Sequence, residues 1–282
     1  MRPGIARGTP GRARPDPILV EYVLGELEAL VGLAPSDVVR RRLALHPDLV
    51  AKAAAVPPHI DDPAWAATVD AVTVQETRLF RSPVQLEFLR AVVLPELVRA
   101  ARARGARRLR LLSAGCATGE EAWTLAVLAT DALAGADDVA SEVVGIDLSR
   151  PALRAAASGT YPSGPLDPLR DVPARFRPCF ITSAASVAAA EPLHGAVRFA
   201  RANLLRVGDF DGFDAILCRN VCIYLTDNAR RAVAGGLAGL LRPGGALLLG
   251  PTDSAPAGMG LRPWSRDTVS VFRGPDAGAS HG

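Results

Sequence analysis

The stretch A-I-L-C-R-N-V-C-I-Y, residues 215–224, runs from four apolar residues directly into Arg219 and Asn220. A strand that is apolar on both faces is typical of a parallel sheet buried between helices. Ligands bind such sheets at the carboxyl ends of the strands, so the polar side chains from Arg219 to Tyr224 are expected to contact a ligand. The structural alternative is a loop in which Arg219 and Asn220 only cap a helix beginning near Thr226.

A second motif, L-L-S-A-G-C-A-T-G-E-E at residues 111–121, predicts a strand, a glycine turn and the start of a helix. Gly115 and Gly119 allow a tight turn that approaches a ligand closely, and the helix N-terminus presents free amide groups. The spacing matches neither the G-x-G-x-x-G nor the G-x-x-x-x-G-K-[ST] motif. Glu120 and Glu121 in the first helical turn suit a cationic or hydroxyl-bearing ligand, although acids there also complement the helix dipole.

Strands and helices alternate along the rest of this region. Apolar runs predict strands over residues 143–147, 197–200 and 246–250, a helix over 227–241 and a last strand over 268–272. This alternation predicts an α/β fold with a parallel sheet.

Polar residues follow two of these strands. Asp147 ends one strand and can accept hydrogen bonds from both hydroxyls of a ribose, or it can cap the helix that begins near Pro151. Asn203 and Leu204 follow the strand over 197–200 and are positioned to line the same crevice.

The order of these motifs resembles the CheR family of chemotaxis-receptor glutamate O-methyltransferases, which use S-adenosylmethionine. The resemblance rests on G-x-x-x-G-E-E at 115–121, on the strand-end Asp147, on F-D-x-I-x-C-R-N-V-x-I-Y at 213–224 and on L-R-P-G-G at 241–245. Upstream, T-V-Q-E-T-R-L-F-R at 73–81 is similar to the family's T-x-N-E-T-x-F-F-R segment.

The resemblance implies a Rossmann-like S-adenosylmethionine-dependent methyltransferase fold with a small N-terminal helical domain. We expect a disordered basic leader over residues 1–15, a helical domain and linker over 16–72, the methyltransferase domain over 73–273 and a disordered tail over 274–282. Residues 161–196 lie where the family inserts a small β-subdomain. We expect one strand within 176–181, but the sequence shows no clear three-stranded pattern and does not support tethering through a receptor tail.

The resemblance also implies a cradle for S-adenosylmethionine, with S-adenosylhomocysteine as the product. Its residues are Gln75, Thr77, Arg81, Gly115, Glu121, Asp147, Asn203, Leu204, Arg219 and Asn220. Arg81 and Tyr224 are the catalytic candidates, the first to hold the cofactor and a substrate carboxylate, the second to orient the reacting groups. A surface ion pair and a packed aromatic with a satisfied hydroxyl are the respective alternatives. Glutamate is already ionised at neutral pH, so the reaction needs no general base and depends on positioning and electrostatics.

A few positions depart from the family pattern. Gln75 stands where the family usually has Asn, and Leu79 replaces the first phenylalanine of F-F-R. G-P-T-D at 250–253 replaces G-H-S-E, so that Pro251 removes an imidazole and a backbone donor while Asp253 keeps a carboxylate. These differences concern the substrate side of the pocket more than the cofactor side.

The composition fits this class. With 282 residues and 49% hydrophobic content, the chain can fill one large core, or a large and a small one. No apolar run reaches the roughly 20 residues of a membrane span, and the start lacks a secretory signal, so a cytoplasmic location without membrane insertion is expected. The 4 cysteines form no C-x-x-C pair and the 4 histidines lack ligand spacing, so we expect reduced thiols and no metal site.

Basic residues gather near the N-terminus. Helical spacing over residues 17–30 and 35–54 predicts two helices, and the second carries three arginines at 40–42. In the resembling family such a domain helps to dock acidic receptor helices, so chemoreceptor-like cytoplasmic helices are the expected partner of a monomeric enzyme. A solvated face is the alternative, as for a second basic run over 99–110, and nucleic acid is not expected because no recognised motif accompanies the charge.

The function implied is the transfer of a methyl group to glutamate carboxylates of a chemoreceptor-like protein, forming methyl esters in signalling adaptation. Two alternatives remain: a methyltransferase acting on a small-molecule acceptor, and a non-catalytic adaptor that senses S-adenosylmethionine. Arg81 and Tyr224 favour an enzyme over the adaptor, and the arginine-bearing helices favour a protein substrate.

Overall fold

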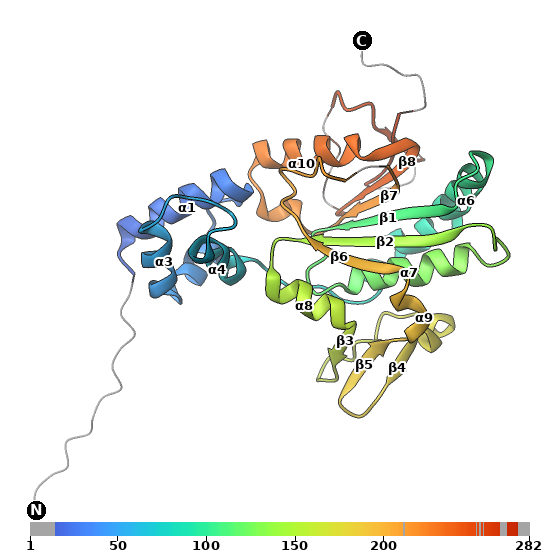
Figure 1. Ribbon diagram of the computed structural model, residues 1–282, viewed down its shortest axis with the longest axis horizontal. Coiled ribbons are helices and arrows are strands. Elements are labelled where there is room, and N and C mark those ends of the chain that lie inside the picture. Colours follow the sequence, from blue (N-terminus) through green and yellow to red (C-terminus); the bar gives the residue numbers. More distant parts are fainter. Residues whose placement is uncertain are drawn as a thin grey trace, which may run out of the picture. The chain divides into compact units, whose positions relative to one another are not determined.

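A computed structural model of the chain describes residues 15–210, 212–251, 253, 255, 257–265 and 270–275. The chain divides into two compact units (Figure 1), one formed by Met1–Leu30 and Pro35–Thr73 and the other by Val31–Ala34 and Val74–Gly282. The leader expected over 1–15 and the tail expected over 274–282 lie almost wholly outside the described residues.

The first unit contains the helices α1 (Pro17–Val31), α2 (Asp37–Ala44), α3 (Pro47–Ala54) and α4 (Pro63–Val72). The single helix expected over 35–54 is wrong, because a proline disfavours helical backbone at the residue before it and Pro47 begins a new helix. His46 accordingly has φ −128° and ψ 58°. Ser36 caps α2, and Asp62 caps α4, a helix that the sequence does not predict.

The arginine run at 40–42 is largely engaged inside this unit. Arg40 donates to both carboxylate oxygens of Glu21 at 3.0 Å. Arg42 donates to the carbonyl oxygen of Thr73 at 2.5 Å, whereas Arg41 is exposed. Exchanging all three for acids would therefore disturb the unit itself, and Arg41 is the member of the run best placed to meet an acidic partner.

The second unit is built on a seven-stranded sheet in the order β6 (Val197–Arg201), β2 (Ala140–Asp147), β1 (Arg108–Ala114), β7 (Phe213–Cys218), β8 (Leu241–Leu249), β10 (Val271–Arg273) and β9 (Arg262–Pro263). The first five strands are parallel, and β10 is antiparallel to both neighbours. The helices are α5 (Pro83–Phe88), α6 (Leu94–Ala103), α7 (Glu120–Ala132), α8 (Arg150–Ser158) and α10 (Asp227–Gly239), together with the π-helical turn η1 (Leu89–Val93) and the 3₁₀ turn η3 (Cys222–Tyr224). The expected α/β fold is confirmed.

The strand register brings the carboxyl ends of the parallel strands to one edge. Ala114 of β1 pairs with Ile146 of β2, and Cys218 of β7 pairs with Leu249 of β8. The chain runs outward from β1 through β2 to β6, and then returns to β7 on the other side of β1. Such a reversal leaves a crevice beyond the carboxyl ends of β1 and β7, where ligands of doubly wound sheets bind.

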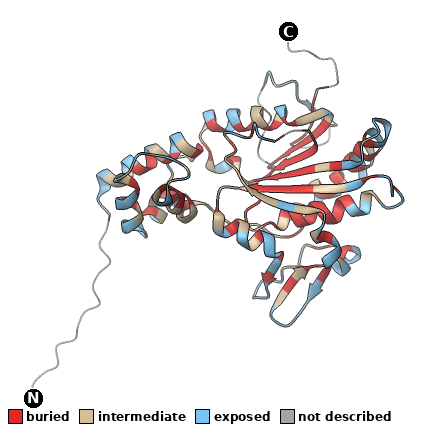
Figure 2. Cartoon of the chain, viewed as in Figure 1, coloured by how far each residue is buried: buried red, intermediate tan, exposed pale blue. Residues whose placement is uncertain are grey.

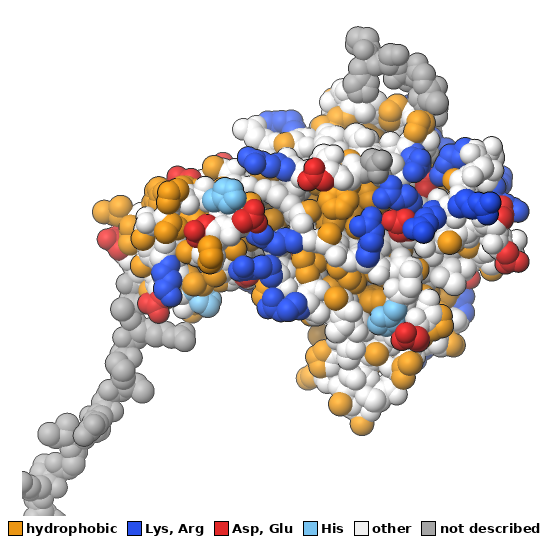
Figure 3. Space-filling model, viewed as in Figure 1, with side chains coloured by type: hydrophobic (Ala, Val, Ile, Leu, Met, Phe, Trp, Pro, Cys, Tyr) orange, Lys and Arg blue, Asp and Glu red, His pale blue; other side chains and the backbone are white. Residues whose placement is uncertain are grey.

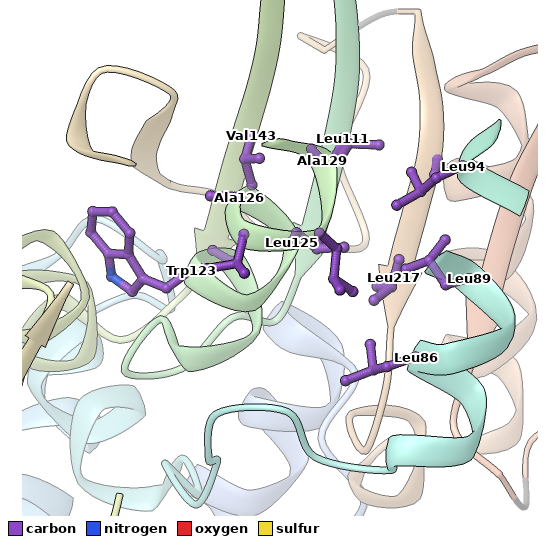
Figure 4. Packing of buried hydrophobic residues seen from close by; sticks show 14 of the residues in the cluster. Leu86, Leu89, Leu94, Leu111, Trp123, Leu125, Ala126, Ala129, Val143 and Leu217 are labelled. Carbon is purple, nitrogen blue, oxygen red and sulfur yellow. The ribbon is translucent and has the colours of Figure 1, made fainter. Parts of the chain in front are cut away.

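Both faces of the sheet are apolar, because neighbouring residues of a strand point to opposite faces. Leu111 and Leu112 of β1 thus belong to two separate hydrophobic cores. In the first core, Leu86 of α5 and Leu125 of α7 pack with Leu217 of β7 (Figure 4). The central strands are accordingly the most continuously buried part of the unit (Figure 2), which gives the polar residues at their ends a rigid support.

The strands at the C-terminal end differ from the expectation. β8 begins at Leu241, ahead of the expected 246. The segment L-R-P-G-G belongs to this strand, because Leu241 pairs with Phe213 of β7 across a shift in the register. β10 overlaps the strand expected over 268–272, of which 268 and 269 lie outside the described residues. The two-residue strand β9 is too short to leave a pattern in the sequence.

The region expected to hold an insert forms a small antiparallel sheet of its own. It consists of β3 (Thr160–Pro162), η2 (Ala174–Cys179), β4 (Phe180–Thr182), β5 (Ser186–Ala189) and α9 (Glu191–His194), with the strands in the order β3-β5-β4. The strand expected within 176–181 is mostly wrong, because a 3₁₀ turn occupies 174–179. Strands of three or four residues rich in Ala and Ser are too short for a legible alternation, so the three-stranded pattern escapes sequence analysis.

The second basic run over 99–110 is exposed over most of its length, as the solvated-face alternative holds, but some of its arginines pair with the sheet. Arg104 forms an ion pair with Asp214, a residue of β7 that is 1% exposed. Arg108 lies 3.2 Å from Glu142 of β2, and Arg110 stacks over the ring of Phe213. Figure 3 shows basic and acidic side chains interspersed over the end of the sheet where β1 and β2 begin. These arginines therefore hold the amino-terminal edge of the sheet together.

Within the described residues, no helix is both long enough and apolar enough to cross a membrane. Cys116, Cys179, Cys218 and Cys222 are free thiols, as expected.

Candidate functional site

The turn after β1 admits only glycine at two positions. Gly115 and Gly119 have φ values of +77° and +90°. A Cβ atom at Gly115 would overlap the side chain of Val221, and one at Gly119 would lie 2.7 Å from the Cβ of Ala156. The backbone of the turn therefore packs directly against Val221 and Ala156, which fixes the tight connection between β1 and α7.

Asp147 fixes this turn from the end of β2. Its Oδ2 accepts the backbone N–H of Ala117 at 2.8 Å, and its Oδ1 accepts that of Ser149 at 2.9 Å. The helix-cap alternative for Asp147 is wrong, because Ser149 caps α8 by accepting from Ala152. Each carboxylate oxygen has more than one lone pair, so a carboxylate held in this way still accepts further hydroxyl donors.

Other predicted residues meet beside Asp147. Gln75 donates from Nε2 to the Oγ of Ser149 at 2.7 Å, which ties the segment before α5 to the end of β2. The backbone N–H of Ala202 donates to the carbonyl of Asp147, so Asn203 and Leu204 follow directly beside it. Thr77 is partly buried in the same segment as Gln75.

Glu121 at the start of α7 and Arg219 at the end of β7 form a buried ion pair. The Nε of Arg219 lies 2.6 Å from Oε2 of Glu121, and Ser113 donates to Oε1 at 2.8 Å. Only 6% of Arg219 and 9% of Glu121 are exposed. The helix-cap alternative for Arg219 is wrong as well, since Thr226 caps α10. The ion pair and the Ser113 hydroxyl thus connect the end of β7 to the start of α7 and to β1.

Arg219 also reaches the segment that carries Arg81. Its NH1 donates to the carbonyl oxygen of Arg81 at 2.8 Å and to Oε1 of Gln85 at 3.4 Å. The Arg81 side chain is partly exposed and donates to the carbonyl of Glu76 at 3.1 Å. It makes no ion pair with any residue in the described part of the chain, so the surface-ion-pair alternative is not observed.

Asn220 and Tyr224 follow Arg219 in the loop between β7 and α10. Asn220 adopts φ +59° directly after Arg219. Tyr224 ends η3, and its carbonyl accepts the N–H of Ala34 at 2.8 Å. Its hydroxyl has no hydrogen-bond partner among the described residues, so the alternative of a satisfied hydroxyl is not observed either.

Backbone strain gathers in the same place. The described non-glycine residues with positive φ are Phe80, Ser82, Ala117, Asn220 and Ser270. All except Ser270 belong to the three segments just described. Such conformations cost about 1 to 3 kcal/mol each and persist where the surroundings hold them, typically at functional sites.

Sequence analysis missed several residues that support the site. Gln85 accepts from Arg219 and donates from Nε2 to the carbonyl of Leu249 at 2.9 Å, which links β7 to β8. The hydroxyl of Thr124 accepts the N–H of Phe80 at 3.0 Å. These links join residues that are distant in the sequence, and only the three-dimensional structure reveals them.

The carboxyl of Glu120 is a second acid at the start of α7. Burial raises its pKa, and the hydrogen bond that it accepts from Thr118 at 2.7 Å opposes the shift only in part. Partial burial likewise raises the pKa of Asp253, against the N–H of Gly250 at 3.2 Å. Asp253 therefore lies beside the end of β8, while Thr252 and Ser254 lie outside the described residues.

The raised pKa of Glu120 gives a pH-dependent prediction. The folded protein binds this proton more tightly than the unfolded chain, so the free energy of unfolding falls as pH rises from the ordinary value of 4.5 through the raised folded pKa. Glu120→Gln keeps an acceptor for Thr118 and removes the charge. We expect it to stabilise the protein near pH 7 and to have little effect below about pH 4. Urea unfolding at both pH values measures this, and equal effects at both would contradict it.

Comparison with known proteins identifies the class. Residues 75–261 match the family described as CheR methyltransferase, SAM binding domain. Together with the doubly wound sheet, the glycine turn after β1 and the acid at the end of β2, this match defines an S-adenosylmethionine-dependent methyltransferase.

Curated relatives narrow the class. Chemotaxis protein methyltransferase 1 of Pseudomonas aeruginosa is 34% identical over 193 residues, which cover 66% of this chain and 68% of the relative. The chemotaxis protein methyltransferase of Listeria innocua is 29% identical over 68% of this chain and 71% of its own. The probable biofilm formation methyltransferase WspC of Pseudomonas aeruginosa is 32% identical over 73% of this chain, but only 48% of the relative is covered. The chain belongs to the CheR methyltransferase family.

The residues at this edge fit the cofactor. The glycine turn and the first amide groups of α7 lie at the carboxyl end of β1, where ligands of such sheets bind. Asp147 offers anchored carboxylate oxygens suited to a ribose, and Glu120 adds an acid suited to the cationic end of S-adenosylmethionine. The binding of the cofactor by the ten residues of the cradle stays a prediction. Two of them, Glu121 and Arg219, also form an ion pair with each other.

Asp147 provides the direct test of the cofactor prediction. Hydrogen bonds to a charged acceptor are worth roughly 1.5 to 3 kcal/mol. We therefore expect Asp147→Ala to weaken binding of S-adenosylhomocysteine by about 10- to 100-fold in calorimetric titration. Glu142→Ala, at the opposite end of the same strand, is the matched control. Equal affinities for both variants would remove Asp147 from the site.

Proposed function

We propose that this methyltransferase transfers a methyl group to glutamate side-chain carboxylates of a chemoreceptor-like protein and forms glutamate methyl esters. The observation that carries the proposal is the Arg81 guanidinium, which projects from a strained and anchored segment and has no carboxylate partner among the described residues. A guanidinium is well matched to a carboxylate substrate because it forms two parallel, charge-assisted hydrogen bonds. Relatives named chemotaxis protein methyltransferases support the choice of acceptor.

The chemistry asks little of the protein beyond orientation. S-adenosylmethionine supplies an activated methyl group when bound. A glutamate carboxylate is ionised at neutral pH, so no side chain has to remove a proton. Arg81 would hold one carboxylate in line with the methyl group, and the Tyr224 hydroxyl would fix the reacting groups from the η3 side. Holding reactants in this way is worth several powers of ten in rate.

Such a substrate would be met in the cytoplasm. All proposed site residues lie in the second unit, and we infer that the enzyme acts as a monomer. Acceptors other than receptor helices would have to satisfy the same Arg81 group, and a small carboxylate is the competing substrate that the altered segment at Pro251 and Asp253 leaves open.

The proposal is tested by the chemical bond that the enzyme makes. The protein is incubated with methyl-labelled S-adenosylmethionine and receptor cytoplasmic fragments, and the labelled fragments are then exposed to mild alkali. We expect alkali to release the label as methanol. In an untreated sample, peptide sequencing should map the label to glutamates. Label that survives alkali would indicate N-methylation and overturn the proposal. Label that appears only on a small carboxylate in competition would favour the alternative substrate.

Tyr224 separates binding from chemistry. Tyr224→Phe keeps the ring and removes a hydroxyl that has no partner among the described residues, so the fold should be unaffected. If the hydroxyl acts mainly in the transition state, kcat should fall by about 10- to 100-fold while the Kd for S-adenosylhomocysteine changes less than about threefold. Equal turnover numbers for Tyr224→Phe and the unaltered enzyme would end the catalytic role of this tyrosine.

A further inference from the structure

The insert contacts the segment that carries Arg81, and the helix α5 that follows it, at three separate points. Arg78 forms an ion pair with Asp171, and Arg175 lies 3.2 Å from Glu87. Between them, the rings of Phe80 and Phe176 are stacked, with centroids 5.5 Å apart and planes 24° from parallel. About ninety residues of sequence separate the two sides of this contact. The insert is thus fastened directly to the residues on either side of Arg81.

The backbone at Arg81 is one that needs holding. Phe80 and Ser82 have φ values of +54° and +62°, so Arg81 lies between two residues in the left-handed region. This conformation is unfavourable for side chains larger than glycine, and a bulky residue such as Phe80 adopts it only when its surroundings enforce it. The segment would therefore relax if its contacts were removed, and relaxation would turn the Arg81 side chain away from its present direction.

Phe80 and Arg81 are held in this conformation by two hydrogen bonds and one ring contact. The N–H of Phe80 donates to Thr124 on α7, and the carbonyl of Arg81 accepts from Arg219 at the end of β7. These two bonds fix the backbone on the side of the sheet. The ring of Phe80 is 3% exposed and stacks on that of Phe176, which is 5% exposed. Of these contacts, only the ring stack comes from the insert.

We propose that Phe176, on the insert, is a positioning residue that holds the strained Phe80 and so aims the Arg81 guanidinium at the substrate carboxylate. This inference rests on the proposed catalytic role of Arg81. The insert thereby contributes to methyl transfer, because its Phe176 supplies one of the contacts that hold the segment carrying Arg81. A change at Phe176 therefore acts on turnover through Arg81, at a distance from the reacting atoms.

The test compares two phenylalanines of the insert. Phe180 on β4 is also 5% exposed and belongs to the same core, but its ring makes no stacking contact with Phe80. Phe176→Ala and Phe180→Ala should thus lower the melting temperature to similar extents. Only Phe176→Ala should lower kcat beyond that shared effect, by about 10- to 100-fold, because small misplacements of a catalytic group cost this much. Phe176→Leu keeps most of the volume and should recover part of the rate.

A second measurement does not depend on activity. Hydrogen exchange in the cofactor-free protein reports on the amide of Phe80, which is protected by its bond to Thr124. Exchange over residues 76–82 should be faster in Phe176→Ala than in Phe180→Ala, and Phe176→Leu should be intermediate. Because Arg81 is also a predicted cofactor contact, the Kd for S-adenosylhomocysteine is measured in all three variants and kcat is compared at saturating cofactor.

The outcomes separate the inference from the proposed function. Equal kcat values and equal exchange for the two alanine variants would overturn the positioning role of Phe176. Faster exchange with unchanged kcat would also overturn it, because the segment would then move without affecting the reaction. If the unaltered enzyme forms no glutamate ester, the proposed function fails, whereas the exchange comparison still decides whether Phe176 holds the segment.

Discussion

Replacing Arg219 with methionine should lower the free energy of unfolding by about 3 to 5 kcal/mol, because it leaves the Glu121 carboxylate buried without its partner. The two side chains are 6% and 9% exposed, and their charged atoms lie 2.6 Å apart. Ser113 alone cannot neutralise the remaining charge. The same change frees the carbonyl of Arg81, so we expect cofactor binding and turnover to fall together. Denaturant unfolding measures the first effect, and calorimetric titration measures the second.

A double-mutant cycle isolates the ion pair from the packing of Arg219. Glu121→Gln removes the charge and keeps an acceptor for Ser113. Combining it with Arg219→Met leaves no buried charge, so the double variant should be more stable than Arg219→Met alone. If the free energy of unfolding of the Arg219→Met variant falls by less than about 1 kcal/mol, water screens the pair. The stabilising role assigned to the ion pair would then be wrong.

Replacing Arg81 with alanine should lower kcat by about 100- to 1000-fold, the range seen when one charge-stabilising donor is removed from an active site. Its guanidinium is partly exposed and, among the described residues, donates only to the Glu76 carbonyl, so the free energy of unfolding should change by less than about 0.5 kcal/mol. Arg81→Lys should recover little activity, because an ammonium group lacks the planar fork of a guanidinium.

Arg90 provides the matched control for Arg81. It lies on η1 in ion pairs with Glu87 and Asp131, close in sequence to Arg81 but without a proposed role in the reaction. Arg90→Ala should leave kcat within about threefold of the unaltered enzyme. If Arg81→Ala behaves in the same way, the substrate carboxylate is held by another group and the proposed mechanism fails.

The sequence predicts most of the sheet edge because its signals there are local. The all-apolar strand before Arg219 and the glycine turn after β1 can each be recognised from a few consecutive residues. The register then aligns the carboxyl ends of β1, β2 and β7 without further information. This is why Gly115, Asp147 and Arg219 are found at one edge, as predicted.

The remaining features depend on contacts between distant residues. Nothing near Glu121 in the sequence shows that its partner is Arg219, and nothing near Phe80 points to Phe176. The break between α2 and α3 was legible in principle from Pro47, whereas the three short strands of the insert were not. Side chains assigned to the cofactor by resemblance can thus also serve the fold, as the ion pair between Glu121 and Arg219 does.

A crystal structure of the protein with S-adenosylhomocysteine tests the central claim most directly. We predict that the ribose hydroxyls lie within hydrogen-bonding distance of Asp147, that the backbone at Gly115 contacts the ligand, and that the sulfur atom faces the space between Arg81 and Tyr224. A ligand bound away from the carboxyl ends of β1 and β7, or one whose sulfur atom is shielded from Arg81, would contradict both the site and the mechanism proposed for it.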